Sequence, residues 1–214
     1  QHQDYLIKPE GYNIPYDAER IHGISTELAI EQGIALQEVL EKFNIALSKT
    51  KFIVGQNLGF DINIMGCELH RMGIDSPMGS MPVLDTCTEV TASLLKLPGG
   101  RGGKFKLPTL TELHNYLFQV PFAEAHNATA DVEATSRCFL ELIRLEIFTA
   151  AELHVDADYF AAFQNKNPRP IQSIGLTHVN LKEASEKIRQ VQGDKQTAPI
   201  SKKELSDNKQ LLVD

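Results

Sequence analysis

The sequence predicts an α/β fold, in which a sheet is layered with helices. Two short apolar stretches, residues 51–55 and 82–85, are typical of strands in a sheet that is covered on both faces. Amphipathic helical patterns follow each stretch, and strands that alternate with helices at these distances indicate a layered architecture. The 214 residues, 42% of them hydrophobic, suffice for one sizeable core plus an appendage.

The first fifty residues are expected to hold a short strand and a long helix. Residues 4–8 have the composition of a strand, which Pro9 and Gly11 end. A loop rich in Pro, Asn and Asp follows, and a helix signal begins after Ser25. Apolar residues then recur at helical spacing and predict an amphipathic helix over residues 35–49. These apolar residues are Leu36, Val39, Leu40, Phe43 and Leu47.

The middle of the chain alternates between strands and helices. After the strand at 51–55, a helix is expected over residues 60–72, with Gly73 at its end. The strand at 82–85 precedes a helix near residues 88–97. The remaining expected elements are a glycine-rich basic loop at 98–106, a helix marked by Leu107, Leu110, Leu113 and Leu117, and a helix that runs to Phe148.

The character of the chain changes after about residue 150. Residues 165–170, with the sequence NKNPRP, are typical of a linker. A strand is expected at 174–181 and a short amphipathic helix at 182–192. From Gly193 onward the chain is polar, and we expect it to be loosely ordered.

Composition and charge limit the classes of protein that the chain could represent. A formal net charge of −7 argues against a protein that coats nucleic acid by bulk electrostatics. It leaves open an enzyme that meets phosphates through bound metal ions. The cysteines Cys67, Cys87 and Cys138 form neither a zinc pattern nor a disulfide framework, so we expect buried thiols in a reducing cytoplasm. The sequence has no apolar run of membrane-spanning length and no signal peptide, which favours a cytoplasmic protein.

Asp61 is the first candidate for chemistry. It lies early in the helix predicted after the strand at 51–55, on one helical face with Ile64, Met65 and Met72. A carboxylate on an apolar, inward face is costly unless it is paired or binds a metal. The alternative is that Asp61 only stabilises the start of its helix, where acidic residues are favoured.

Asp131 and His126 form the second candidate. Thr135, Cys138 and Leu142 follow Asp131 at helical spacing, so this acid also borders an inward face. Helix capping and a loop histidine are the alternatives. Facing carboxylates from two helices make a site for Mg²⁺ or Mn²⁺, which prefer oxygen ligands. His126 would then take a proton from a metal-polarised water.

Three segments occur in an order that resembles the DEDDh (DnaQ-like) 3′–5′ exonucleases, a family that includes the proofreading epsilon subunit of bacterial DNA polymerase III. The segment IHGIS at 21–25 is similar to the family's I-H-G-I-[TS]. NLGFD at 57–61 is similar to the motif N-x-x-F-D, and HNATAD at 126–131 to H-x-A-x-x-D. Residues 84–86 and 107–110 fit positions between those motifs. The order and spacing of the segments together make the resemblance specific.

The resemblance implies a ribonuclease H-like mixed sheet flanked by helices and a set of site residues. Asp61 and Asp131 would be metal ligands for two divalent ions, Mg²⁺ or Mn²⁺, and His126 the general base. His22, Asn57 and Phe60 match positions near the terminal nucleotide of a single-stranded or frayed DNA 3′ end. The implied partner is a DNA polymerase catalytic subunit or domain.

The resemblance covers about residues 3–148 and leaves out one motif. We therefore expect an exonuclease domain at 1–148 and a linker or partner-binding extension at 149–214. The family's first motif, D-x-E on the central strand, is absent from the printed sequence. We expect it upstream, on the first of two missing strands, and we expect the 214 residues alone to be inactive and poorly stable. The longer parent protein should be an active exonuclease.

Two weaker signals lie outside these motifs. The loop at 98–106 does not match the phosphate-binding pattern G-x-x-x-x-G-K-[ST]. The basic residues in and just before this loop are Lys96, Arg101, Lys104 and Lys106. They either contact a DNA backbone or face solvent. The end of the chain, residues 210–214, is at most a faint sliding-clamp-like peptide.

The leading hypothesis is a metal-dependent DNA exonuclease that proofreads during replication. An RNA-trimming exonuclease of the same superfamily is the first alternative. The second is a non-catalytic polymerase-binding module with a degenerate exonuclease fold. The presence of Asp61, His126 and Asp131 speaks for an enzyme, and the missing D-x-E pair speaks for the module.

Overall fold

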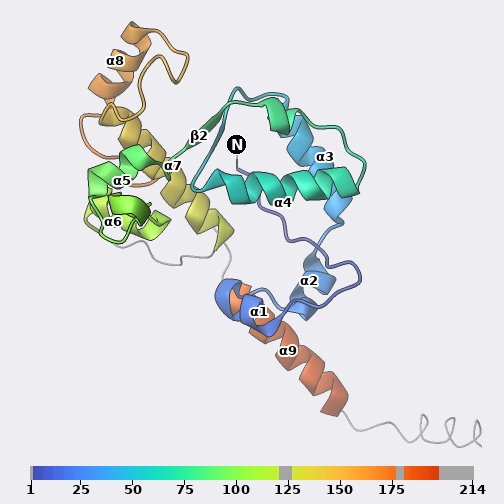
Figure 1. Ribbon diagram of the computed structural model, residues 1–214. Coiled ribbons are helices and arrows are strands. Elements are labelled where there is room, and N and C mark those ends of the chain that lie inside the picture. The colour runs from blue at the N-terminus through green and yellow to red at the C-terminus, as the bar shows by residue number, and fades with distance from the viewer. Residues whose placement is uncertain (1, 121–126, 177–180, 198–214) are drawn as a thin grey trace, which may run out of the picture. The chain divides into compact units, whose positions relative to one another are not determined.

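A computed structural model describes residues 2–120, 127–176 and 181–197, with side chains described up to residue 190. The helices are α1 (Tyr16–His22), α2 (Thr26–Gln32), α3 (Leu36–Leu47), α4 (Leu58–Arg71), α5 (Glu89–Leu95), α6 (Leu110–Phe118), α7 (Ala128–Arg144), α8 (Ala157–Lys166) and α9 (Leu181–Thr197). The strands are β1 (Ile53–Gly55) and β2 (Val83–Asp85), and short 3-10 turns span Pro77–Ser80 and Arg101–Gly103 (Figure 1).

The chain packs as two units, and each is described by itself. The first unit contains residues 1–7 and 34–178, and the second contains residues 8–33 and 179–214. This division by packing differs from the predicted sequence boundary at residue 148. That boundary concerns the extent of the exonuclease segment and stays a prediction.

The sheet of the first unit is small. β1 and β2 pair in parallel, with Val54 opposite Leu84 and Gly55 opposite Asp85. Both strands were predicted from their apolar sequences, and the parallel pair confirms an α/β arrangement for this part of the chain. Across the described residues the structure is mostly helical, with two strands rather than the larger mixed sheet that was expected.

Two predicted strands are wrong where the structure describes them. In the stretch 4–8, Ile7 forms an isolated bridge with Ile34, and the stretch has no further strand pairing among the described residues. The N–H of Ile34 donates to the carbonyl of Leu6 at 2.9 Å. Residues 174–176 are not a strand, since the N–H of Ile174 donates to the side chain of Glu133. α9 confirms the helix predicted at 182–192, but it begins at Leu181, which was expected to end the strand, and it continues to Thr197, past Gly193 where loose order was expected.

The long helices confirm the apolar periodicity. α3, α4, α5, α6 and α7 all lie where amphipathic patterns predict them, and side chains cap three of them. Thr109 and Glu112 form a reciprocal capping box at the start of α6. Thr88 caps α5, and the Asn127 side chain accepts the N–H groups of Thr129 and Ala130 at the start of α7.

The sequence patterns missed α1 and α8. Residues of α1 were expected to be loop, and no element was expected at 157–166. Neither helix has a fully buried residue, so the apolar periodicity that marks a helix in the sequence is weak in both. In α8, Phe160 and Phe163 pack only partly buried against the core, and the side chain of Asp156 accepts the Tyr159 N–H at 2.7 Å at the start of the helix.

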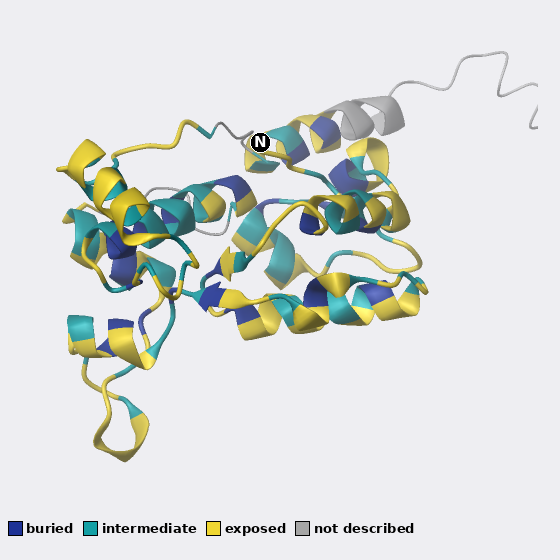
Figure 2. Cartoon of the chain, turned by 90° about the horizontal axis from the view of Figure 1, so that it is seen from above, coloured by how far each residue is buried: buried dark blue, intermediate teal, exposed yellow. Residues whose placement is uncertain are grey.

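Two apolar clusters stabilise the first unit. One packs β2 against α6 and α7 through Leu84, Leu113, Cys138, Leu142, Ile143 and Phe148. The other packs α3 against α4 through Leu40, Leu47, Leu69 and Met78. Each such side chain contributes about 1.5–3 kcal/mol by leaving water. In Figure 2 the buried residues alternate with exposed ones along the helices, as amphipathic packing requires.

The cysteines are only partly as expected. Cys138 is buried, and burial raises the pKa of its thiol to about 12. Cys87 is half-buried. Cys67 is exposed, contrary to the prediction, because it lies in step with the exposed Asn63 and His70 on the outer face of α4. Among the described residues, no helix combines the length and apolar character that crossing a membrane requires.

Candidate active site

The carboxyl ends of β1 and β2 meet at one edge of the sheet, because the strands are parallel. β1 ends at Gly55, and the chain turns directly into α4. A Cβ atom on Gly55 would lie 2.4 Å from a methyl carbon of Leu58, so any larger residue there would force the Leu58 side chain to move. The start of α4 is therefore held against the strand that precedes it.

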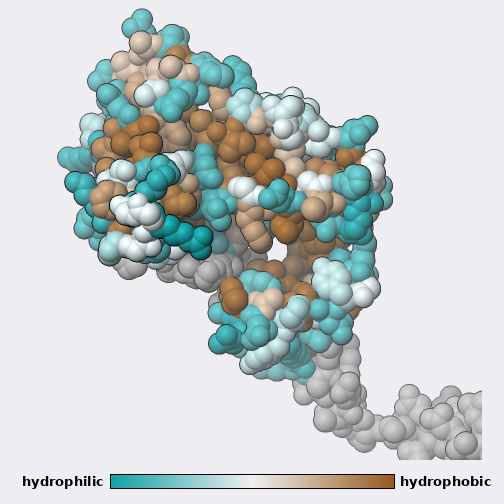
Figure 3. Space-filling model, viewed as in Figure 1, coloured by the Kyte–Doolittle hydropathy of each residue, from teal (hydrophilic) through white to brown (hydrophobic). Residues whose placement is uncertain are grey.

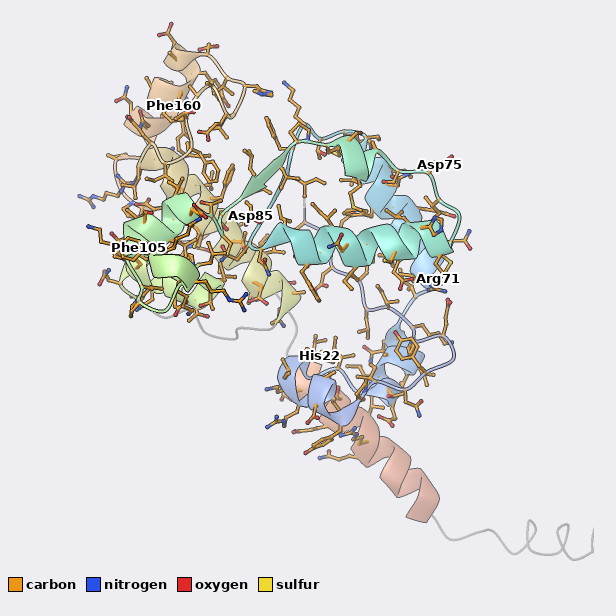
Figure 4. All side chains as sticks on the ribbon, in the orientation of Figure 1. His22, Arg71, Asp75, Asp85, Phe105 and Phe160 are labelled. Carbon is orange, nitrogen blue, oxygen red and sulfur yellow. The ribbon has the colours of Figure 1, made fainter. Side chains whose placement is uncertain are left out.

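Asp85, at the end of β2, fixes the turn between β1 and α4 (Figure 4). Its carboxylate accepts the N–H groups of Asn57 at 2.8 Å, Leu58 at 2.9 Å and Cys87 at 2.7 Å. Asn57 adopts the left-handed conformation, with φ of 60°, that aims the first two of these N–H groups. Sequence reasoning assigned no role to Asp85, although an acid at the end of an apolar strand is a recognisable signal.

Asp61 lies in the first turn of α4 and lines a cavity of about 860 Å³. The predicted inward face of this helix is wrong at its first turn, because Asp61 and Ile64 are both exposed. Partial burial raises the pKa of its carboxyl, the helix backbone opposes this shift, and the nearby charge of Asp85 adds to it. A carboxylate whose charge is disfavoured by its surroundings gains from a nearby cation. Asp61 is thus suited to the role of cation ligand that the sequence predicts.

Asp131 lies in the first turn of α7 and lines the same cavity. Thr135 and Phe139 follow it along the cavity face of the helix, and Leu110 of α6 completes an apolar wall. The structure therefore brings together the two carboxylates that the sequence assigned to one site, from helices seventy residues apart in the chain.

His126, the predicted general base, lies outside the described residues. The structure does describe its neighbour Asn127, whose side chain accepts the N–H groups of Thr129 at 3.1 Å and Ala130 at 3.2 Å. The hydroxyl of Thr129 in turn donates to Asp4 at 2.7 Å. The start of α7, which carries Asp131, is held by these contacts.

The residues predicted to contact a nucleotide lie in two units. Asn57 and Phe60 flank the start of α4, and both are exposed, Phe60 to 66% of its surface. His22 belongs to the second unit, at the end of α1. Its Nδ1 accepts the Ile24 N–H at 3.0 Å, and burial lowers the pKa of its imidazole against the opposing charge of Glu19.

A buried polar network underlies the strand ends. The amide nitrogen of Gln56 donates to the carbonyl of Pro108 at 2.8 Å, and the buried hydroxyl of Thr86 bonds both Gln56 and the carbonyl of Gly55. Thr91 donates to the carbonyl of Thr86 at 2.9 Å. Sequence reasoning missed this network, since it joins residues up to 52 positions apart.

The described residues supply part of a metal site. Within the ranges that the structure describes, no group of three His, Cys, Asp or Glu side chains is placed to hold a metal ion. Two carboxylates on one cavity fit the oxygen preference of Mg²⁺ or Mn²⁺, but each ion requires further oxygen ligands. Asp61 and Asp131 would hold the ions, and Asp85 is already engaged by three backbone donors.

Two of the four basic residues in and before the glycine-rich loop are neutralised by ion pairs. Lys104 pairs with Glu89, and Lys106 pairs with Glu112 at 2.6 Å. The loop itself contains a single 3-10 turn, consistent with the predicted glycine-rich loop. Figure 3 shows hydrophilic residues gathered over this part of the unit and apolar ones around the strands, where Val54 and Val83 are exposed.

Comparison with known proteins decides the family. Residues 1–139 match the sequence profile of the family RNase_T, described as an exonuclease. The chain belongs to this exonuclease family. The match confirms the resemblance drawn from residues 21–25, 57–61 and 126–131, and membership implies a ribonuclease H-like fold, of which β1, β2 and their helices are the described part.

One curated relative shares a substantial segment. The chain is 33% identical over 131 residues, or 61% of its length, to the protein named 3′-5′ exonuclease DinG of Bacillus subtilis (strain 168). The matched segment is 13% of that protein, so the chain spans a small part of its relative.

Proposed function

We propose that the protein is a metal-dependent 3′–5′ exonuclease that removes nucleotides from DNA 3′ ends. One observation carries the proposal: Asp61 and Asp131, from two different helices, line the same cavity in a chain of the exonuclease family. The name of the relative from Bacillus subtilis supports the direction of digestion.

The proposed reaction is hydrolysis of the terminal phosphodiester. A water oxygen forms a bond to phosphorus while the bond to the leaving 3′ oxygen breaks, and His126 accepts the proton of the water. Asp61 and Asp131 would hold divalent ions, which would supply charge stabilisation for the reaction. Asn57, Phe60 and His22 position the terminal nucleotide, with the exposed ring of Phe60 available to stack on a base.

Proofreading during replication is the role we propose for this activity. A frayed or mismatched 3′ end provides the single-stranded terminus that such a site accepts, and a DNA polymerase catalytic subunit or domain would deliver it. RNA trimming and a non-catalytic polymerase-binding module are the competing functions, and each predicts a different result in one assay.

The test uses the full-length protein with 5′-labelled DNA and RNA oligonucleotides of matched sequence, some with a mismatched 3′ end. We expect stepwise shortening of DNA from the 3′ end with Mg²⁺ or Mn²⁺, loss of activity in EDTA, and faster removal of mismatched ends. Asp61→Asn should lower kcat by about 10³-fold, the upper range for losing one charge-stabilising group. Preference for RNA would establish the trimming function, and no metal-dependent hydrolysis of either polymer would refute the enzyme.

A further inference from the structure

The start of α4 is capped by a side chain from another part of the chain. Asn57, the residue before the helix, makes no side-chain bond that caps it. The Asp85 carboxylate at the end of β2 takes this role, because it accepts the N–H groups of Asn57 and Leu58, which lie 28 and 27 residues away in the sequence (Figure 4). The position of the first turn of α4 therefore depends on β2 as well as on the strand that precedes the helix.

The neighbouring helices of this unit are capped differently. Thr88, Thr109 and Asn127 stand at the starts of α5, α6 and α7, and the side chain of each accepts an N–H group of its own helix. Such a local cap moves together with the helix to which it belongs. An acceptor on a strand instead fixes the start of the helix relative to the sheet, so the cap of α4 determines the position of that helix as well as its stability.

Asp61 depends on this first turn for its place in the cavity. It lies one turn after Asn57, and it lines the cavity together with Leu58 and with Asp131 of α7. The first N–H groups of a helix have no acceptor within the helix, so the terminal turn frays when its cap is lost. Loss of the bonds to Asp85 would therefore move Asp61 relative to Asp131.

Asp85 holds the helix without being placed as a cation ligand of the cavity. It is not among the described residues that line the cavity, and its oxygens accept three N–H groups, the third from Cys87. A carboxylate has about four acceptor sites, so little capacity remains for a metal ion. Asp85 is nevertheless a near neighbour of Asp61: partial burial raises the pKa of the Asp61 carboxyl, and the charge of Asp85 adds to this shift.

We propose that Asp85 is a positioning residue of the exonuclease: by bonding the start of α4 to the end of β2, it sets the place of Asp61 relative to Asp131. The inference rests on the proposed function, in which Asp61 and Asp131 hold divalent ions. It assigns a third acid to the working part of the enzyme, with a role that differs from that of a metal ligand.

Graded substitution of Asp85 in the full-length protein tests this inference. Asp85→Asn can keep the two bonds of Oδ1, to Asn57 and Cys87, but its NH2 group would face the Leu58 N–H, and Asp85→Ala loses all three bonds. We expect kcat/KM on single-stranded DNA to fall by about 10-fold in Asp85→Asn and by about 100-fold in Asp85→Ala, the scale of a small misplacement of a reacting group. In an Asp61→Asn background, Asp85→Asn should change kcat/KM by less than about 2-fold, because residues that act through one another are not additive. Equal losses in both backgrounds would overturn the inference.

A matched variant separates positioning from stability. Thr88→Ala removes the cap of α5, a helix that contributes no described residue to the lining of the cavity. It should lower the melting temperature by an amount comparable to that of Asp85→Asn and leave kcat/KM unchanged. If Thr88→Ala lost as much activity as Asp85→Asn, the loss would reflect stability alone and the inference would be wrong. Asp85→Asn keeps two of the three bonds, so the test remains decisive if Asp85→Ala does not fold.

Two readouts independent of activity complete the design. Amide hydrogen exchange at Asn57 and Leu58 should be faster in Asp85→Asn than in the wild type, and Mn²⁺ alone should broaden the resonances of Asp61 only at a higher concentration. If the wild-type protein hydrolyses no DNA, the proposed function fails, and these two measurements still decide whether Asp85 places Asp61. Unchanged exchange and an unchanged Mn²⁺ concentration in Asp85→Asn would refute the positioning role, whatever the activity.

Discussion

The two faces of α7 differ in how their polar groups are used. Asp131 and Thr135 face the cavity shared with Asp61. Glu133 and Arg137, two positions further along and so about 200° around the helix, hold other parts of the chain. Arg137 donates to the carbonyl of Ile171 at 3.1 Å, and Glu133 accepts from Ser173 at 2.7 Å. One helix thus separates a binding face from an anchoring face.

The largest expected effect tests this separation directly. Asp131→Asn should lower kcat by about 10³-fold, since the neutral amide cannot replace the charge of a carboxylate at the site. The melting temperature should stay close to that of the wild type. Steady-state exonuclease assays and thermal unfolding of the full-length protein measure the two quantities.

Glu133→Gln is the matched control on the opposite face. The amide oxygen can still accept from the Ser173 hydroxyl and the Ile174 N–H, which lie 2.7 and 3.3 Å from the carboxylate. We expect unchanged kcat and a loss of less than about 1 kcal/mol in unfolding free energy. If both variants lost activity equally, the division of α7 into two faces would be wrong.

The next effect concerns stability alone. On the anchoring side, Glu141 keeps only 3% of its side chain exposed and accepts both bonds of the Arg144 guanidinium, at 2.8 and 2.5 Å. Arg144→Met should cost about 3 kcal/mol, the lower end of the range for breaking a buried pair, because the Arg144 side chain is 24% exposed. Denaturant unfolding measures this loss, and kcat should not change.

The double variant Glu141→Leu, Arg144→Met sharpens the result. Replacing both members of a buried pair by apolar residues of similar volume is often nearly neutral, so most of the lost stability should return. A double variant as unstable as Arg144→Met would mean that the loss comes from packing rather than from an uncompensated carboxylate.

The same contrast explains what could be predicted from the sequence. Asp61 and Asp131 were assigned to one site because motif order and helical periodicity are local properties of the sequence. The roles of Asp85, Gln56 and Thr86 could not be read in this way, since each depends on partners that only folding brings near. The helices α1 and α8 were missed for a different reason: apolar periodicity detects burial, and neither helix has a fully buried residue.

The sheet marks the limit of prediction from local patterns. Residues 51–55 and 82–85 were correctly assigned because their apolar runs persist wherever a strand is covered on both faces. Residues 4–8 have a similar composition, but a strand is defined by its hydrogen-bonded neighbour, and here the pairing is limited to Ile34. Strand propensity shows that a segment is able to form a strand, but the strand forms only when a neighbouring segment is available for hydrogen bonding.

The smallest expected effect is a pH dependence that belongs to the anchoring face. His114 is buried against Phe118, its Nε2 accepts from Arg137 at 2.9 Å, and its Nδ1 donates to the carbonyl of Val120 at 3.1 Å. This arrangement requires the neutral ring, because the Arg137 guanidinium can only donate. Burial, followed by the charge of Arg137, lowers the pKa of His114, and the Val120 carbonyl opposes the shift.

The direction of the effect on stability follows from this lowered pKa. The unfolded chain takes up a proton near pH 6.5 and the folded chain only at lower pH, so the contribution of His114 is complete above pH 6.5 and declines as the pH falls toward the folded pKa. The decline is at most about 1.4 kcal/mol for each pH unit.

Urea unfolding of the wild type and of His114→Gln at pH 7.5 and 5.5 measures this decline, and His22 contributes equally to both proteins. We expect the drop in unfolding free energy to be smaller in His114→Gln, while Asp131-dependent catalysis keeps the same pH profile. An identical drop in both proteins would show that His114 does not couple protonation to folding, and that the anchoring face depends on Glu133, Arg137 and Glu141 alone.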